Sequence, residues 1–430
     1  SSCRMTAPTT PIFRCPRCAP CSTATVWPCG CPAGGGAAAA PGPTGAPGSF
    51  SHLTVEDGLP HSYVRAILED GDGFMWFATA RGLVRYDGAR LVVYRHDPDD
   101  PGSLPFGEPT SLFEDRERRL WVGTASSRWA GLGVLDRGTG RFTRYLADGQ
   151  PGSLSAPYVQ AIYQDREGRL WVGHAQGVDL FDPAAKTFRA FPIGPEGSEP
   201  RVMAMVEDSR GTFWVATERR GLFQLDRATG KFRGFSVRDR EEAGARDPDD
   251  PFFAAFLEQP AGTLWVAGYG AGLVRIDLDR ERARRYRPDP RRTDSLSVAQ
   301  VVALAGDGDR LVYVGTENGG LDVLDVPSER LTHFRPDRAD PRSLGSASIW
   351  ALYRDQQGLV WAGTNGFGVS WLSPLAQRFE SIRAGRDGLG DPRVSSIAEG
   401  EDGRIWIGTD GGGLHVVDPR TGQVSRYPLP

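Results

Sequence analysis

The sequence predicts an all-β fold made of a repeated unit of four short strands. One aromatic position recurs at steps of 45, 50, 43, 51, 48, 48 and 45 residues, at Trp76, Trp121, Trp171, Trp214, Trp265, Tyr313, Trp361 and Trp406. Turn residues stand at fixed offsets from it, and the 430-residue chain contains 55 glycines and 33 prolines. A period of roughly 40 to 50 residues with such turns is typical of a β-propeller, a radial array of small sheets.

Each strand of the unit has its own pattern. The first is an apolar stretch such as 63–68, which leads into an Asp-x-x-Gly turn such as 70–73. Asp bonds its own backbone in such turns, and Gly adopts positive φ. The second strand carries the periodic aromatic residue, as in 120–124. The third runs from Gly-Leu to Asp, as in 82–87, and the fourth is an aromatic-rich edge strand such as 141–145.

Two positions of the unit hold only small residues. Every first strand has Ala or Ser at its middle, from Ala66 to Ser396, and Gly or Ala stands two residues after every periodic aromatic residue. Small residues are expected where innermost strands crowd around an axis and where sheets approach closely. We therefore interpret the tryptophan series as core between blades, and not as a ligand site.

The edge strands indicate how the ring closes. Eight sets of the first three strands are accompanied by nine edge-like stretches, beginning with residues 50–53. A ring hides its terminal edges when strands from both ends share one blade, so Phe50–Thr54 is predicted to complete the blade of 348–372. This gives a seven-bladed propeller over 49–375 and an additional repeat over 376–430, the start of a second propeller. An eight-bladed ring is the alternative.

The first 48 residues form a separate leader. All six cysteines lie there, at Cys3, Cys15, Cys18, Cys21, Cys29 and Cys31, with spacings that zinc or an iron–sulfur cluster could use. The segment has no histidine and is rich in Pro, Ala and Gly, so we interpret 1–48 as a disordered leader without a metal site. Whether this leader belongs to the native protein stays open. No secretory signal peptide or membrane-spanning run is visible.

Composition and motifs argue against several functions. The net charge is −4 without a Lys/Arg block, so no nucleic-acid partner and no membrane contact are expected. The six histidines are scattered, outside the spacings typical of metal sites, and no G-x-S-x-G motif occurs. We therefore predict a non-catalytic propeller without a cofactor.

The loops after the second strands vary most between units. Variation over a constant scaffold is typical of a recognition surface, although ordinary loop variation is the better explanation for any single residue. A small polar ligand, such as an oligosaccharide or an organic acid, would suit their aromatic, Arg and Asn side chains. The candidate ligand-binding residues are Arg81, Trp129, His174, Arg219, Arg220, Tyr269, Asn318, Asn365 and Phe367.

Several stretches resemble the two-component regulator propeller family. They include Glu56–Leu59, Gly73–Thr79, Gly82–Gly88, the Asp-Pro-x-Ser-Leu connectors at 100–104 and 340–344, and Ile405–Leu414. The resemblance implies a periplasmic or other extracytoplasmic sensor region of hybrid histidine kinases or diguanylate cyclases. It also implies two seven-bladed propellers followed by membrane and signalling domains, so the downstream signalling domains are missing from this sequence. Whether the protein forms a homodimer stays open.

Two other functions stay open. Stand-alone propellers of similar repeat style include the streptogramin lyases, which use a histidine and a metal at one mouth, and here His174 and Glu218 come near that pattern. A protein-interaction scaffold is the third alternative, and it would require a broad apolar patch in place of a polar pocket.

Overall fold

The computed structural model describes residues 49–194, 199–237, 252–280, 282–373, 382, 388–400, 402–418 and 423–427. All regular elements in these ranges are β-strands, which pair into eight antiparallel four-stranded sheets. The predicted all-β fold of four-stranded blades is therefore confirmed. The leader 1–48, with the cysteines, lies outside the described residues. Within the described ranges, the structure has no helix that could span a membrane.

We number the sheets as blades in chain order. Blade 1 has β2 (Val64–Glu69), β3 (Met75–Thr79), β4 (Gly82–Tyr86) and β5 (Leu91–Tyr94). Blade 2 has β6 (Glu108–Glu114), β7 (Leu120–Ala125), β8 (Gly131–Asp136) and β9 (Arg141–Leu146). Blade 3 has β10 (Ala161–Gln164), β11 (Leu170–His174), β12 (Gly177–Asp182) and β13 (Thr187–Pro192). Blade 4 has β14 (Val202–Glu207), β15 (Phe213–Thr217), β16 (Leu222–Asp226) and β17 (Lys231–Phe235).

The remaining sheets follow the same order. Blade 5 has β18 (Phe252–Glu258), β19 (Thr263–Tyr269), β20 (Gly272–Asp277) and β21 (Arg282–Tyr286). Blade 6 has β22 (Val301–Asp307), β23 (Leu311–Thr316), β24 (Leu321–Asp325) and β25 (Arg330–Phe334). Blade 7 has β26 (Ile349–Arg354), β27 (Val360–Thr364), β28 (Val369–Leu372) and β1 (Phe50–Leu53). The C-terminal sheet has β29 (Val394–Glu399), β30 (Ile405–Thr409), β31 (Gly413–Val417) and β32 (Val424–Tyr427).

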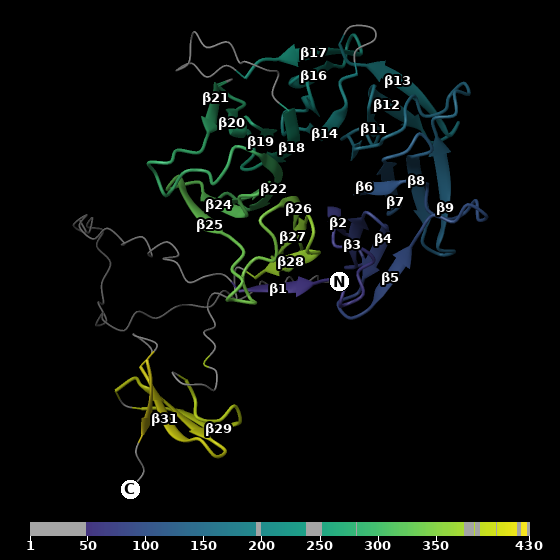
Figure 1. Cartoon of the computed structure of the whole chain (residues 1–430). Coiled ribbons are helices and arrows are strands. Elements are labelled where there is room, and N and C mark those ends of the chain that lie inside the picture. The colour runs from purple at the N-terminus through teal and green to yellow at the C-terminus, as the bar shows by residue number, and fades with distance from the viewer. Residues whose placement is uncertain are drawn as a thin grey trace, which may run out of the picture. The chain divides into compact units, whose positions relative to one another are not determined.

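The innermost strands of blades 1 to 7 form a closed series of contacts. Each touches the innermost strand of the next blade, from β2 through β6, β10, β14, β18 and β22 to β26, and β26 contacts β2. Figure 1 shows these blades around a common centre. The small residues of the repeat permit this approach, since a Cβ added at Gly363 of blade 7 would lie 2.9 Å from Cγ1 of Val64 in blade 1.

A strand from the N-terminal side completes blade 7. β1 pairs with β28 in antiparallel register, with Phe50 opposite Leu372 and Leu53 opposite Val369. The predicted sharing of one blade by residues 50–54 and 348–372 is therefore confirmed. Because β1 covers the outer edge of β28, the chain segments that begin and end the ring protect each other from edge-to-edge pairing.

The periodic tryptophans of the ring lie in the core, as predicted, and five of them are tied to their own turn by the same hydrogen bond. Trp76, Trp121, Trp171 and Trp214 are at most 2% exposed. The indole N–H of Trp171 donates to Oδ2 of Asp165, six residues earlier, at 2.9 Å, and blades 1, 2, 4 and 7 repeat the bond. The Asp of the Asp-x-x-Gly turn thus pairs the polar atom of the ring that fills the core.

The C-terminal sheet has the strand order and register of the blades but a different exposure. Ile397 faces Ile407 as Ile67 faces Phe77 in blade 1. Ile397 is 67% exposed, whereas Ile67 is 8% exposed. The whole of β29 is exposed, although the equivalent strands of the ring are packed. This sheet is therefore a repeat whose apolar inner face is uncovered.

We predict that Asp165→Ala lowers the free energy of unfolding by about 1–3 kcal/mol at neutral pH, because it leaves the buried indole N–H of Trp171 unpaired. Urea denaturation followed by tryptophan fluorescence measures this. Asp136→Ala, which removes an exposed turn carboxylate, is the control and should lose less. Equal losses in both variants would contradict the role given to the indole bond.

The same bond predicts that the free energy of unfolding depends on pH. Burial alone would raise the pKa of Asp165, but hydrogen bonds from Trp171 and Arg169 lower it. A lowered pKa in the folded state means that the stabilisation is present at neutral pH and is lost as the pH falls through the folded-state pKa. Asp165→Ala should therefore flatten the acid side of the stability profile.

Candidate functional site

The loops after the second strands and the connectors before the first strands lie at the same end of each blade. The amide of Ala80, in such a loop, donates to the carbonyl oxygen of Tyr63 at 3.2 Å, and the amide of Glu317 donates to that of Gln300 at 2.9 Å. The candidate residues on these loops therefore share one end of the blades with the first residues of the innermost strands.

A β-bulge lies at that end of the innermost strands. In seven of the eight sheets the register slips by one residue just before the small residue at the middle of the strand. A bulge changes the direction of a side chain and is frequent beside functional sites. The extra residues in the ring are Arg65, Thr110, Met203, Ala254, Val302 and Trp350.

Two of these bulge residues meet across the contact between β2 and β26. The guanidinium carbon of Arg65 lies 5.6 Å from the ring centroid of Trp350 and 4.8 Å from that of Tyr63. The two rings meet edge to face, with centroids 5.8 Å apart. Arg65 thus lies against two aromatic rings, an arrangement that holds a guanidinium in place.

Two hydrogen-bond donors of this cluster have no partner within the described part of the chain. They are the buried Nε of Arg65 and the buried Nε1 of Trp350. Buried donors are nearly always paired in folded proteins. An acceptor from outside the chain would satisfy both, and the cluster is for that reason the best candidate site in the ring.

Carboxylates border the cluster. Nη2 of Arg65 is 3.6 Å from Oε2 of Glu108, on the next blade. Burial raises the pKa of the Tyr63 hydroxyl, the charge of Arg65 opposes this, and Glu108 and Glu317 add to it. The site therefore offers acceptors as well as donors, with two carboxylates beside one guanidinium.

Three of the predicted residues continue the site along blades 5 to 7. A hydrogen bond to Glu317 raises the pKa of Tyr269, which is 39% exposed and stacks on Phe252. Oδ1 of Asn318 accepts from Oγ of Ser348 at 3.0 Å. The amide of Asn365 donates to the carbonyl oxygen of Ser348 at 2.9 Å, two residues before Trp350.

His174 does not lie on the loop surface where it was expected. It is 2% exposed, with Nε2 3.2 Å from Oδ1 of Asp179, and the amide of Gln176 donates to its Nδ1. It stands where other blades have a Thr that bonds the loop, such as Thr79 to the carbonyl oxygen of Gly82. His174 therefore belongs to the interior of blade 3, and we leave it out of the candidate site.

The other predicted residues are spread over different loops. Arg81, Arg219 and Arg220 are exposed. Phe367 is half-buried against the ring of His52, at 5.1 Å between centroids. Glu218, the other residue of the lyase-like pattern, pairs with Arg201 at 3.3 Å. Within the described residues, no group of three His, Cys, Asp or Glu could hold a metal ion.

Trp129 lies at a separate site on the rim of blade 2. It is 59% exposed and lines a shallow cavity of about 330 Å³ with Phe106, His96 and three further residues. Phe106 is 45% exposed and packs edge to face on His96 at 5.0 Å. This is a small apolar patch, apart from the Arg65 cluster.

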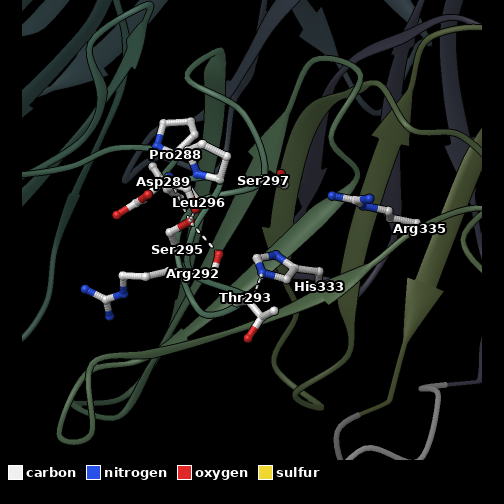
Figure 2. A pocket seen from close by; sticks show the side chains of 10 residues that line it. Pro288, Asp289, Arg292, Thr293, Ser295, Leu296, Ser297, His333 and Arg335 are labelled. Carbon is white, nitrogen blue, oxygen red and sulfur yellow. Dashed lines mark hydrogen bonds between the residues drawn. The ribbon is translucent and has the colours of Figure 1, made fainter.

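A larger cavity, of about 530 Å³, was not anticipated from the sequence. It lies between the connector 288–297 and the edge of blade 6, where His333 and Arg335 face the connector (Figure 2). Most of its lining residues belong to the connector itself.

The closed ring of four-stranded blades defines the chain as a β-propeller. Five segments, residues 58–81, 103–126, 153–176, 343–366 and 388–411, match the model of the two component regulator propeller. The chain therefore carries repeats of this family, as the sequence resemblance indicated. No curated protein matches the sequence.

Solved structures of similar fold include the extracellular domain of a putative hybrid two component system from B. thetaiotaomicron. It matches with a TM-score of 0.65 and 24% identity over 89% of this chain and 50% of that chain. The extracellular domain of a putative one component system from the same organism matches with a TM-score of 0.60 and 19% identity, over 88% and 54% of the two chains. This chain thus spans about half the length of these proteins.

A shorter propeller is also similar. Virginiamycin B lyase from Staphylococcus aureus matches with a TM-score of 0.56 and 15% identity, over 75% of this chain and 98% of that chain. At this identity the likeness shows a shared fold, and fold alone does not carry a reaction from one protein to another.

The position of His174 gives a prediction about stability. His174→Ala should lower the free energy of unfolding by about 1–3 kcal/mol, because it leaves the buried Asp179 without its neighbour and opens space in blade 3. Arg81→Ala, on an exposed loop, should change it by less than about 0.5 kcal/mol. Chemical denaturation of both variants checks this. An unchanged free energy of unfolding in His174→Ala would contradict the interior position given to His174.

Proposed function

We propose that this chain is a non-catalytic, extracytoplasmic propeller that binds a ligand and acts as the sensor region of a two-component signalling protein. The family repeats and the likeness to extracellular domains of such systems support the sensor class. The observation that carries ligand binding is the pair of unpaired buried donors on Arg65 and Trp350, which neighbouring bulges bring together.

The chemistry of the cluster favours a small polar ligand or an oligosaccharide. Nε of Arg65 and Nε1 of Trp350 would donate to ligand oxygens. The carboxylates of Glu108 and Glu317 would accept from ligand hydroxyl groups, and the rings of Tyr63 and Trp350 would contact its apolar edges. A strongly anionic ligand is disfavoured, because two carboxylates border a single guanidinium.

We also propose that 376–430 is an additional propeller repeat that starts a second propeller. The exposed inner strand β29 supports this, because in every ring blade the neighbouring blade covers the equivalent apolar positions. The signal would then pass to downstream signalling domains, and a homodimer is one arrangement that could transmit it.

The exposed Trp129 and Phe106 favour a second candidate function, which is protein interaction at the rim of blade 2. Their cavity is lined mainly by apolar groups, unlike the Arg65 cluster. Against an enzyme of the lyase type, His174 is buried against Asp179, and Glu218 is paired with Arg201.

A thermal-shift screen with mono- and oligosaccharides and organic acids tests the proposed function. Compounds that raise the melting temperature of the wild type should lose most of this effect with Trp350→Phe, which keeps a ring but removes the N–H donor. Arg65→Gln should lose it too. Trp129→Phe is the matched control at the rim and should keep the full shift.

A full shift with Trp350→Phe, together with its loss in Trp129→Phe, would move the binding site to the rim of blade 2. If no compound shifts the wild type, binding of these ligand classes is contradicted.

A further inference from the structure

His333 joins the edge of blade 6 to the connector that precedes the blade. On β25, its Nδ1 lies 2.6 Å from Oδ1 of Asp322, which is on β24 and fully buried. Its Nε2 lies 3.0 Å from the carbonyl oxygen of Thr293 in the connector. The other oxygen of Asp322 accepts from the amide of Ser297 at 2.8 Å. We call Asp322, His333 and their two connector partners, Thr293 and Ser297, the blade 6 clamp. Figure 2 shows His333, Thr293 and Ser297 of this clamp.

Both partners of the imidazole in the blade 6 clamp are hydrogen-bond acceptors. A carboxylate and a backbone carbonyl oxygen have no proton to donate, whereas a neutral imidazole has a single N–H. Both bonds can form together only when both ring nitrogens carry a proton. We infer that His333 is an imidazolium in this structure and that the blade 6 clamp is a proton-dependent latch on the connector 288–297.

The equivalent contact in blade 7 shows what is special about this latch. There His52 occupies the position of His333, with Nδ1 3.0 Å from Oγ of Ser370 and Nε2 3.1 Å from the carbonyl oxygen of Pro341. A hydroxyl group donates or accepts, so a neutral ring can satisfy both bonds in blade 7. The replacement of Ser370 by Asp322 is what makes a charge necessary in blade 6.

The net effect of the groups around His333 is to raise its pKa. The hydrogen bond that His333 donates to Asp322 raises the pKa of His333 above its ordinary value of 6.5, whereas burial and the charge of Arg335 oppose this rise. Asp289 and Arg292, from the connector, line the same cavity and have opposite charges. Because the folded-state pKa is raised, the latch is fully closed at low pH and opens as the pH rises through that pKa.

The bond that opens is the one to the connector. When the ring loses a proton, its remaining N–H stays with the carboxylate of Asp322, since a hydrogen bond to a charged acceptor is the stronger one. The lone pair on Nε2 then faces the lone pairs of the Thr293 carbonyl oxygen. The connector therefore loses its attachment to β25 but keeps the bond from Ser297 to Asp322.

The residues that closely follow the connector, Ala299 and Gln300, support two loops of the candidate site. The amide of Gly270, beside Tyr269, donates to the carbonyl oxygen of Ala299 at 3.0 Å, and that of Glu317 donates to the carbonyl oxygen of Gln300 at 2.9 Å. Opening of the latch would therefore loosen the end of the ring where Tyr269 and Glu317 lie. The inference goes beyond the proposed function and holds whether or not that end binds a ligand.

Hydrogen exchange followed by mass spectrometry tests the latch. The whole chain is labelled at pH values from 5.5 to 8.5, after correction for the intrinsic pH dependence of exchange, and the connector 337–345 of blade 7 is the internal reference. In the wild type, protection of 288–297 relative to this reference should fall several-fold as the pH rises. In Asp322→Ser, which copies the contact of blade 7, the ratio should stay constant.

A titration of the histidine ring signals by NMR is the second measurement. The His333 signal, identified by its absence in His333→Gln, should titrate with a midpoint above 6.5 in the wild type. A midpoint at or below 6.5, or a wild-type exchange ratio that does not change with pH, would overturn the inference. If Asp322→Ser does not fold, the titration of His333 in the wild type is the test of the latch. Neither measurement uses a ligand, so failure of the proposed function would leave both readable.

Discussion

The structure depends on one hydrogen bond repeated around the ring, from the buried tryptophan indole to the Asp that begins the preceding turn. A tryptophan fills the space between two blades, but its N–H must be paired when water is excluded. An Asp six residues earlier pairs it while also holding the backbone of the turn, as Asp70 does for Trp76 and Phe74. Packing, turn and strand register are therefore fixed by the same carboxylate, which explains why both residues recur together.

The fold could be predicted because this constraint is visible along the chain. The period of Trp76 to Trp406, the Asp-x-x-Gly turns and the count of edge strands are local patterns, and they led to blades of four strands and to the pairing of β1 with β28. The sequence analysis did not predict the indole bond itself, although the spacing of six residues between Asp165 and Trp171 is visible in the sequence. Blade 5 departs from this bond, because Trp265 donates to the backbone carbonyl oxygen of Gln259.

The site was less predictable, because the apolar pattern of the first strands does not indicate that a bulge turns one of their residues. Arg65 and Trp350 belong to first strands whose apolar pattern indicates core, and they meet only because neighbouring blades bring two bulges together. Loop variation pointed to the end of the blades that carries Tyr269 and Asn318, and it included His174, which is buried. A polar residue at a bulge position of an innermost strand is the signal that could have found the cluster.

In the third strands, one side chain depends on whether the neighbouring connector has a backbone N–H to donate. Where the connector has Leu-Pro, as at Pro60 and Pro105, it has no N–H at that point, and the third strand has Val84 or Gly133. Where the connector has an N–H there, a polar side chain accepts it, as Asp179, Asp322, Ser370 and His415 do for Ser155, Ser297, Gly345 and Gly390. Any of these acceptors satisfies the amide. Among these four acceptors, only Asp322 lies opposite a histidine whose second partner is also an acceptor. The residue that satisfies the amide of Ser297 therefore also requires His333 to be charged.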